Sequence, residues 1–158
     1  MIRIGIGYDS HRFAEGRPFI LGGQRIAFEK GLQGHSDADA VAHAVTDAIL
    51  GAAGAGDLGQ MFPDSDPKWK DADSLVLLRL ARERINELGF HPVQADITIV
   101  CERPRLGVYK DAMAHAIAGE LGIAPDAVGM KAKTNEGMGF VGRGEGVAVF
   151  AVAIVEAR

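Results

Sequence analysis

Apolar and polar positions along the chain recur in two periods, one typical of strands and one typical of helices. An apolar run with Ile4, Ile6 and Tyr8 leads into the polar residues of "GYDSHRF" (7–13), which predicts a strand that enters a turn. Apolar residues recur at helical spacing in three later segments, and these predict helices over about 37–54, 74–88 and 108–121. The remaining apolar segments predict a hairpin at 17–28 that turns at Gly22 and Gly23, and strands within 89–106, 128–132 and 146–157.

The ends and lengths of these elements indicate the fold class. Ser36 or Asp37 can cap the first helix and Gly54 can end it, and the polar segment 56–73 has the length of a functional loop. The closing strand, "GVAVFAVAIVEA", is so apolar that we expect it to be covered on both faces. Together the elements predict a single α+β domain over residues 1–158, with a mixed β-sheet on one side packed against α-helices. A doubly covered last strand and the small side chains of the first helix also favour a homo-oligomer.

Composition and charge narrow the classes of function. With 47% hydrophobic and 24% charged residues and a formal net charge of −4, the chain has no basic field, so neither nucleic acid nor an anionic membrane is expected as a partner. The start resembles no secretion signal, and no stretch approaches the ~20 apolar residues of a membrane span. Its one cysteine, Cys101, excludes an intrachain disulfide framework and a zinc site built from several cysteines, which favours a cytoplasmic location.

The first candidate site joins the first strand to the first helix. Asp9 and His11 are two residues apart, so they share a face of the strand, and on the helix His43 shares a face with Asp47 and Asp39. Two imidazoles and one carboxylate form a ligand set suited to zinc with a fourth position free, and Asp47 can orient an imidazole from outside the set. Taken singly, each residue has a plainer interpretation: a carboxylate–histidine hydrogen bond, a satisfied interior histidine, or a solvated helix face.

Two further segments carry groups suited to a phosphorylated ligand. "KAKTNEGMGFVGRGEG" places Lys131, Lys133, Thr134 and Arg143 among five glycines, which suits phosphate, while Glu136 fits only with a hard cation such as Mg²⁺ or Mn²⁺ beside it. The segment "CERPRLG" (101–107) follows a strand and can present backbone groups to a base edge and Arg105 to phosphate. A glycine-rich turn with solvated charges and an ordinary strand-to-helix loop are the alternatives.

Taken together, these segments resemble the 2-C-methyl-D-erythritol 2,4-cyclodiphosphate synthase family of the non-mevalonate isoprenoid pathway. The resemblance runs nearly end to end, through "GYDSHRF", "LGG", "GHSDADAVAHAVTDAILGAAGAGDLG", "FPDSD" and "KAKTNEGMGFVGRGEG", in order. It implies a homotrimer whose sheets face the trimer centre and whose sites lie between adjacent subunits. It also raises a downstream isoprenoid diphosphate in the central channel as a candidate ligand.

The resemblance also implies roles for individual residues. It places one zinc ion per subunit on Asp9, His11 and His43, and magnesium or manganese with the substrate diphosphate on Glu136. Catalytic roles in the transition state fall on His35 and Thr134. The implied substrate contacts are Asp9, His11, His35, Ser36, Asp57, Leu58, Gly59, Phe62, Pro63, Asp64, Ser65, Asp66, Cys101, Glu102, Arg103, Pro104, Arg105, Leu106, Gly107, Lys133, Thr134, Asn135, Glu136, Phe140 and Arg143. Arg105 stands where a lysine is common and Lys133 where a threonine is common, and both residues keep or add positive charge near the phosphate.

The reaction implied by the resemblance is an intramolecular phosphoryl transfer. The family converts 4-diphosphocytidyl-2-C-methyl-D-erythritol 2-phosphate to the 2,4-cyclodiphosphate with release of CMP, so no protein nucleophile is needed. Two other classes compete with it. A zinc hydrolase would use the same ligands with Asp47 or Asp39 as general base, and a non-enzymatic nucleotide-binding or isoprenoid-binding trimer would not need the ligands.

Overall fold

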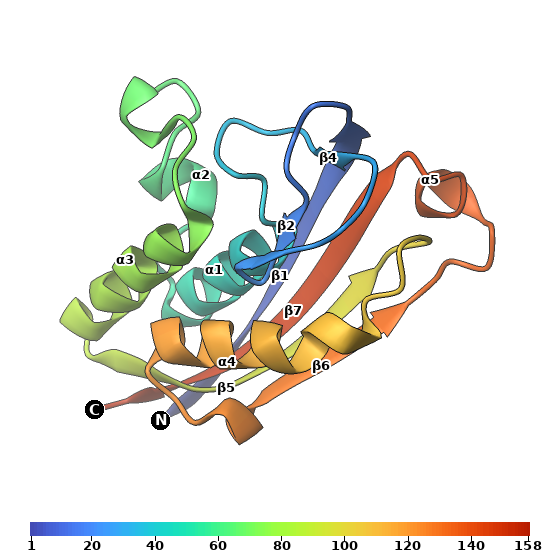
Figure 1. Cartoon of the computed structure of the whole chain (residues 1–158). Coiled ribbons are helices and arrows are strands. Elements are labelled where there is room, and N and C mark those ends of the chain that lie inside the picture. The colour runs from blue at the N-terminus through green and yellow to red at the C-terminus, as the bar shows by residue number, and fades with distance from the viewer.

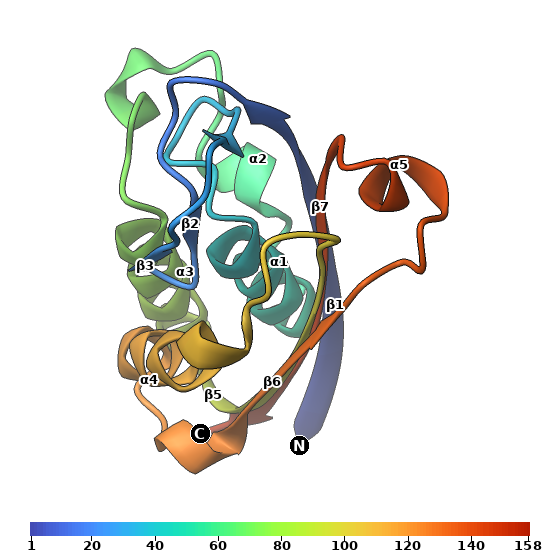
Figure 2. The same cartoon turned by 45° about the vertical axis from the view of Figure 1, so that its right-hand side comes forward.

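The computed structural model describes residues 1–158, which form one mixed sheet covered by helices on one face (Figures 1 and 2). The strands are β1 (Ile2–Ala14), β2 (Ile20–Leu21), β3 (Gln24–Arg25), β4 (Gly31–Leu32), β5 (Phe90–Val100), β6 (Val128–Lys133) and β7 (Gly146–Ala157). The α-helices are α1 (Ala40–Ala53), α2 (Leu58–Met61), α3 (Ser74–Glu87), α4 (Lys110–Leu121) and α5 (Gly139–Gly142). Single 3₁₀ turns are η1 (Pro67–Trp69), η2 (Gly107–Tyr109) and η3 (Pro125–Ala127).

The sheet has the order β4-β1-β7-β5-β6, and β2 and β3 form the predicted hairpin beside it. β1 and β5 each pair antiparallel with β7, whereas β5 and β6 run parallel, so the sheet is mixed. Helices α1, α3 and α4 lie on the same side of it (Figure 2). The predicted α+β class is therefore confirmed. None of the helices combines the length and the apolar character that a membrane span requires.

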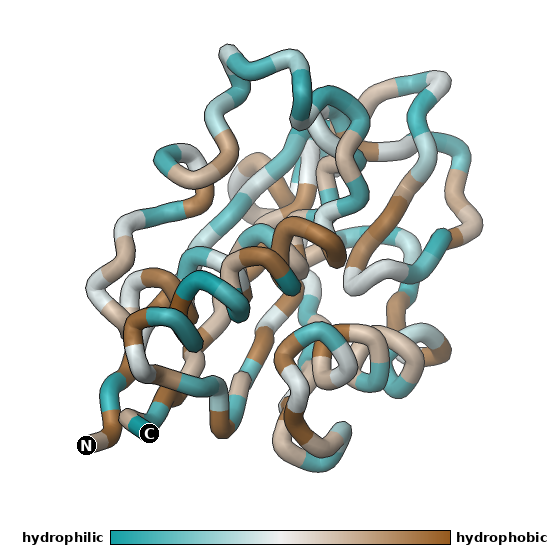
Figure 3. The backbone as a smooth tube through the Cα atoms, turned by 90° about the vertical axis from the view of Figure 1, so that its left-hand side faces the viewer, coloured by the Kyte–Doolittle hydropathy of each residue, from teal (hydrophilic) through white to brown (hydrophobic).

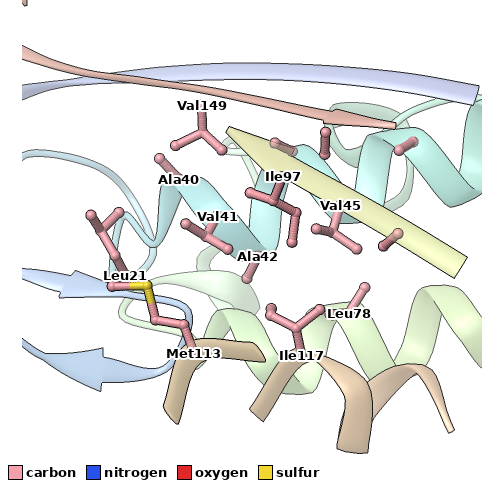
Figure 4. Packing of buried hydrophobic residues seen from close by; sticks show 14 of the residues in the cluster. Leu21, Ala40, Val41, Ala42, Val45, Leu78, Ile97, Met113, Ile117 and Val149 are labelled. Carbon is pink, nitrogen blue, oxygen red and sulfur yellow. The ribbon is translucent and has the colours of Figure 1, made fainter. Parts of the chain in front are cut away.

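Helix α1 lies at the centre of the core, between the sheet and the other helices. The core joins Val41 and Val45 of α1 to Ile97 of β5 and Val149 of β7, with Ile117 of α4 on the other side (Figure 4). Brown apolar stretches of the tube in Figure 3 occur in helices and in strands, separated by teal hydrophilic stretches. The two periods seen in the sequence thus mark the faces that meet in this core.

Strand β1 lies so close to α1 that at two positions no side chain fits between the two backbones. Its odd-numbered residues face the helix, and two of them, Gly5 and Gly7, have no side chain. A methyl group added at Gly7 would overlap the carbonyl oxygen of Ala44, and one at Gly5 would overlap that of Ala48. This contact brings Asp9 and His11, further along the same face of β1, close to the start of α1.

The outer face of the sheet differs from the prediction. Phe150 and Val152 of β7 are 44% and 36% exposed, so the closing strand is covered on one face only within this chain. Across the ladder, Tyr8 is opposite Phe150 and Ile6 is opposite Val152, and the exposed row continues along β1 to Ile4. Apolar character alone does not distinguish a strand buried within one chain from a strand whose second face needs a partner.

Local capping also differs in detail from the prediction. Asp39, rather than Ser36 or Asp37, caps α1 through the backbone N–H of Ala42, while Gly54 ends the helix in a left-handed conformation, as predicted. Helices α2 and α5, a single turn each, lie in segments that were expected to be loops, because their glycines and prolines give no helical period.

Candidate metal centre and active site

Three ligand-type side chains converge where the end of β1 meets the first turns of α1. Asp9 Oδ2 lies 2.8 Å from His11 Nε2 and 3.1 Å from His43 Nδ1, and the two nitrogens are 3.3 Å apart. Zinc bonds of about 2.0–2.1 Å in tetrahedral geometry place neighbouring donor atoms about 3.3 Å apart. The triangle of donor atoms is therefore close to one face of a zinc tetrahedron, and the cluster can hold a metal ion.

The other nitrogen of each imidazole already has a partner, which determines the tautomer of the neutral ring. His11 Nδ1 donates to the carbonyl oxygen of Gln33 at 2.8 Å, because a carbonyl can only accept. His43 Nε2 lies 2.7 Å from Ser74 Oγ, whose own proton is directed to the Asp37 carboxylate. With a metal ion bound, each ring would therefore keep its proton on this outer nitrogen and direct an unprotonated nitrogen toward the centre of the cluster, as metal ligation requires.

Ser74 was not among the residues expected at the site, and Asp37 has a role other than the predicted cap of the first helix. Asp37 accepts from both the backbone N–H and the hydroxyl of Ser74, and so fixes the start of α3 beside His43. Ser36 Oγ lies 3.1 Å from the same His43 nitrogen. Nothing in the local sequence around Ser74 separates it from an ordinary residue at a helix start, because its partner lies 31 residues earlier in the chain.

We expect Ser74→Ala to lower zinc affinity about 10- to 100-fold, the usual effect of losing a partner that orients a metal-bound histidine. The hydroxyl is the acceptor that keeps the proton of His43 on Nε2, and alanine removes it. Competition titration with a zinc chelator measures the change, and Ser74→Thr, which keeps the hydroxyl, should restore most of the affinity. Equal zinc affinity in Ser74→Ala and the wild-type protein would contradict the role given to Ser74.

Charges within the cluster favour a carboxylate paired with imidazoles. Burial opposes ionisation of Asp9, but hydrogen bonds and charges from His11 and His43 outweigh it and hold the pKa of Asp9 below its usual value. Burial likewise opposes protonation of His11, but the hydrogen bond and charge of Asp9 raise its pKa above the usual value. A divalent cation bound between the three side chains would replace the positive charge of a protonated imidazole.

Neither of the other two carboxylates of the helix stripe makes a hydrogen bond to the cluster. Asp47 was expected to orient an imidazole, but its Oδ1 accepts from the backbone N–H of Leu58 at 2.7 Å, so that prediction is wrong. Asp39 is fully buried and accepts from the backbone N–H groups of Gly22, Gly23 and Ala42 at 2.8–3.1 Å. Burial raises its pKa to about 6. Both carboxylates hold the backbone around the site, and neither lines the hollow beside the cluster.

A hollow of about 200 Å³ opens directly beside the cluster. Besides the three ligand-type residues, it is lined by Gly34, His35, Ser36, Leu58, Phe62, Asp64, Trp69 and Leu77. The structure thus brings His35 and parts of the 57–66 segment to the metal cluster. Phe62 is buried against the edge of Trp69, and Asp57 caps α2 in a reciprocal pair with Gln60, so part of this segment serves to shape the wall.

A second hollow, of about 290 Å³, lies where the ends of the parallel strands β5 and β6 meet, and it shares no lining residue with the first. It is lined by Cys101, Glu102, Pro104, Arg105, Leu106, Gly107, Lys110, Ala132, Lys133 and Thr134. The N–H of Cys101 donates to the carbonyl oxygen of Lys133 at 2.8 Å, which joins the two segments. Two of the three motifs found in the sequence therefore form one site.

Several residues of this second hollow have structural duties. The carboxylate of Glu102 accepts from the backbone N–H groups of Asn135 and Gly137, which holds the glycine-rich loop against the 101–107 turn. Burial raises the pKa of the Cys101 thiol to about 12, so Cys101 is no thiolate nucleophile. The side chain of Leu106 is in the core, which leaves its backbone for any ligand.

The glycine-rich loop leaves its acidic residue free. Glu136 is exposed, has a φ of +52°, and its carboxylate makes no hydrogen bond or ion pair within the chain. Arg143 instead pairs with Glu145 at 2.6 Å, and Phe140, 40% exposed, lines a separate hollow with Ser10 and His11. The carboxylate of Glu136 is thus free within the chain, whereas Arg143 has a partner of its own.

Comparison with known proteins gives one consistent family. The model of the YgbB family matches residues 2–156. A 2-C-methyl-D-erythritol 2,4-cyclodiphosphate synthase from Laribacter hongkongensis is 54% identical over 157 residues, covering 99% of this chain and 97% of the relative. The structure of the bifunctional IspDF from Campylobacter jejuni has a TM-score of 0.96 at 42% identity, covering 100% of this chain and 43% of that one. A 2C-methyl-D-erythritol-2,4-cyclodiphosphate synthase solved in a CDP-bound form has a TM-score of 0.89 at 39% identity, covering 98% and 100%.

Proposed function

This chain belongs to the YgbB family of 2-C-methyl-D-erythritol 2,4-cyclodiphosphate synthases, and from that premise we propose the reaction and the residues that perform it. The substrate is 4-diphosphocytidyl-2-C-methyl-D-erythritol 2-phosphate. An oxygen of its 2-phosphate attacks the β-phosphorus of its diphosphate, the bond from that phosphorus to the bridging oxygen breaks, and CMP leaves with that oxygen. No protein nucleophile takes part, so catalysis rests on positioning and on charge.

The triangle of donor atoms on Asp9, His11 and His43 is the observation that carries this proposal. Its edges of 2.8–3.3 Å and its fixed tautomers suit one zinc ion per subunit with a free fourth position. Zinc bound there would act as a Lewis acid and a template for the β-phosphate. The free carboxylate of Glu136 would bind magnesium or manganese together with the substrate diphosphate.

The chain's own residues would hold the rest of the substrate. The first hollow would take the methylerythritol through Ser36, Asp57–Gly59 and Phe62–Asp66, and His35 in its wall would steady charge in the transition state. The second would take the cytidine and diphosphate through Cys101–Gly107, Lys133–Glu136 and Arg143, with Thr134 in the corresponding catalytic role. Arg105 and Lys133 place two cations in or beside its wall, which favours a diphosphate.

Two features support a homotrimer with shared sites. The two hollows have no lining residue in common, which favours a substrate held by the first hollow of one subunit and the second hollow of its neighbour. The exposed apolar row on the outer face of the sheet also needs a cover, and sheets that face the trimer centre would supply it. We extend the proposal to a single-domain cytoplasmic enzyme, with an isoprenoid diphosphate as a candidate ligand of the central channel.

A hydrolase with the same metal ligands is the competing function. It would need a general base beside the metal, but the two carboxylates considered for that role, Asp39 and Asp47, are engaged with backbone N–H groups and do not line the hollow. The second hollow would also have no purpose in simple hydrolysis.

A phosphorus NMR time course of the zinc-loaded protein with the cytidyl substrate and Mg²⁺ tests the proposal. We expect two coupled cyclic-diphosphate signals that grow in step with CMP. Release of CMP with linear phosphomonoesters would show a hydrolase instead. A spectrum that stays unchanged while nucleotide binds would show a binding protein, and either result would overturn the proposed reaction.

A further inference from the structure

A hollow of about 380 Å³ lies at the far end of α3 from the metal cluster. It is bounded by the last turns of α3, the start of β5, the end of α4 and the last residue of the chain, and is lined by Arg82, Asn86, His91, Pro92, Leu121, Gly122 and Arg158. Ser74, which contacts the metal cluster, and Asn86 are twelve residues apart on one helix, or about 18 Å at 1.5 Å per residue. The hollow is therefore separate from the site described above.

Two arginines of this hollow have no anionic partner in the chain. The other arginines of α3 are paired, Arg79 with Glu120 and Arg84 with Glu87. Arg82, between them in sequence, is half-buried yet its guanidinium makes neither an ion pair nor a hydrogen bond, whereas Arg158 is exposed and has no ion pair. A guanidinium withdrawn from water without a counter-charge is costly, so an anion in this hollow would be stabilising.

Buried polar atoms of the same wall also have no partner. They are Arg82 Nε, Asn86 Oδ1 and His91 Nδ1, and each is enclosed by the protein without a hydrogen bond. Unsatisfied buried groups of this kind are rare, and each of these three side chains must turn before its atom can meet a ligand in the hollow. Gly122 permits the arrangement, since a Cβ there would lie 2.9 Å from Arg82 Nη1.

We propose that this hollow binds a small phosphate monoester of a polyol, at a site distinct from the catalytic one. Two guanidiniums and the imidazole of His91 suit a dianionic phosphate. Asn86 Oδ1 is an acceptor, so it requires a donor such as a hydroxyl group on the same ligand. Glu156 lies 3.9 Å from His91 Nε2, on the other side of the ring from the unsatisfied Nδ1. The volume exceeds what free phosphate needs and lies within the range of small-molecule sites.

Residue-resolved NMR of the full chain with sn-glycerol 3-phosphate as the probe tests the proposal. We expect the Arg82 Nε–H and His91 ring signals to shift saturably, and Arg82→Gln to weaken binding, observed at His91, about tenfold or more. Arg84→Gln removes an arginine from the same helix outside the hollow and should leave the affinity unchanged. Turnover should persist in Arg82→Gln, which also shows that the variant folds. If Arg82→Gln does not fold, Arg158→Gln is the second variant.

Three outcomes would overturn the site: no saturable shift at Arg82 or His91, unchanged affinity in Arg82→Gln and Arg158→Gln, or an equal loss in Arg84→Gln. The proposal that the ligand carries hydroxyl groups has its own test. Asn86→Ala should weaken the binding of glycerol phosphate more than the binding of inorganic phosphate. Equal affinities of the wild-type protein for the two probes would overturn that part. Since the signals are read at the hollow itself, these outcomes do not depend on the proposed cyclisation.

Discussion

Replacing His43 by alanine is expected to remove the bound zinc and to lower turnover about a thousandfold. The side chain supplies one of only three donor atoms in the cluster, at 3.1 Å from Asp9 Oδ2 and 3.3 Å from His11 Nε2. A metal contributes several kcal/mol of charge stabilisation in such transition states, and about 4 kcal/mol corresponds to three orders of magnitude in rate. Metal analysis of the purified variant and the phosphorus NMR time course measure the two effects.

His43 is buried and hydrogen-bonded, so loss of zinc must be separated from loss of fold. His11→Ala removes another ligand that lies on the strand rather than the helix, and it should give the same loss of zinc and turnover. His115→Ala, at an exposed position of α4, is the matched control and should keep both. Full zinc stoichiometry in folded His43→Ala would remove His43 from the ligand set.

Replacing Gly7 by alanine is expected to destabilise the fold by about 3 kcal/mol, the upper part of the range for overpacked cores. The added methyl group would overlap the carbonyl oxygen of Ala44, and backbone on both sides leaves no flexible side chain to move. For a domain of this size the loss corresponds to a fall of about 6–12 °C in the melting temperature. Activity should fall as well, because β1 carries Asp9 and His11 and α1 carries His43.

A second glycine of the same region provides the control for this prediction. Gly51 is exposed on α1, and an added methyl group there meets no atom within 4 Å. Gly51→Ala should therefore raise stability by about 0.5–1 kcal/mol, since glycine is a poor residue inside a helix. Thermal unfolding of both variants gives the comparison. A melting temperature for Gly7→Ala equal to that of the wild-type protein would show that β1 and α1 separate without cost.

The sequence by itself determined the features that arise from short-range periodicity. Alternation along β1 placed Asp9 and His11 on one face, and helical spacing located α1 with Gly54 at its end, as the structure confirms. The ligand set followed from residue types and spacing, because two imidazoles and one carboxylate suit zinc with a fourth position free. Motif order across the whole chain indicated the family, which the comparisons confirm.

Only the tertiary structure decided which residues act on one another across the chain. Ser74 meets His43 because α3 packs beside α1, and residues 101–107 meet Lys133 because β5 and β6 are parallel neighbours. In the folded chain, Asp47 accepts a hydrogen bond from the backbone N–H of Leu58 and not from the expected imidazole. It also left the outer face of the sheet exposed and Arg82 without an anion. Periodicity reports which way a side chain points from its own backbone, whereas its partner depends on packing between segments that are distant in sequence.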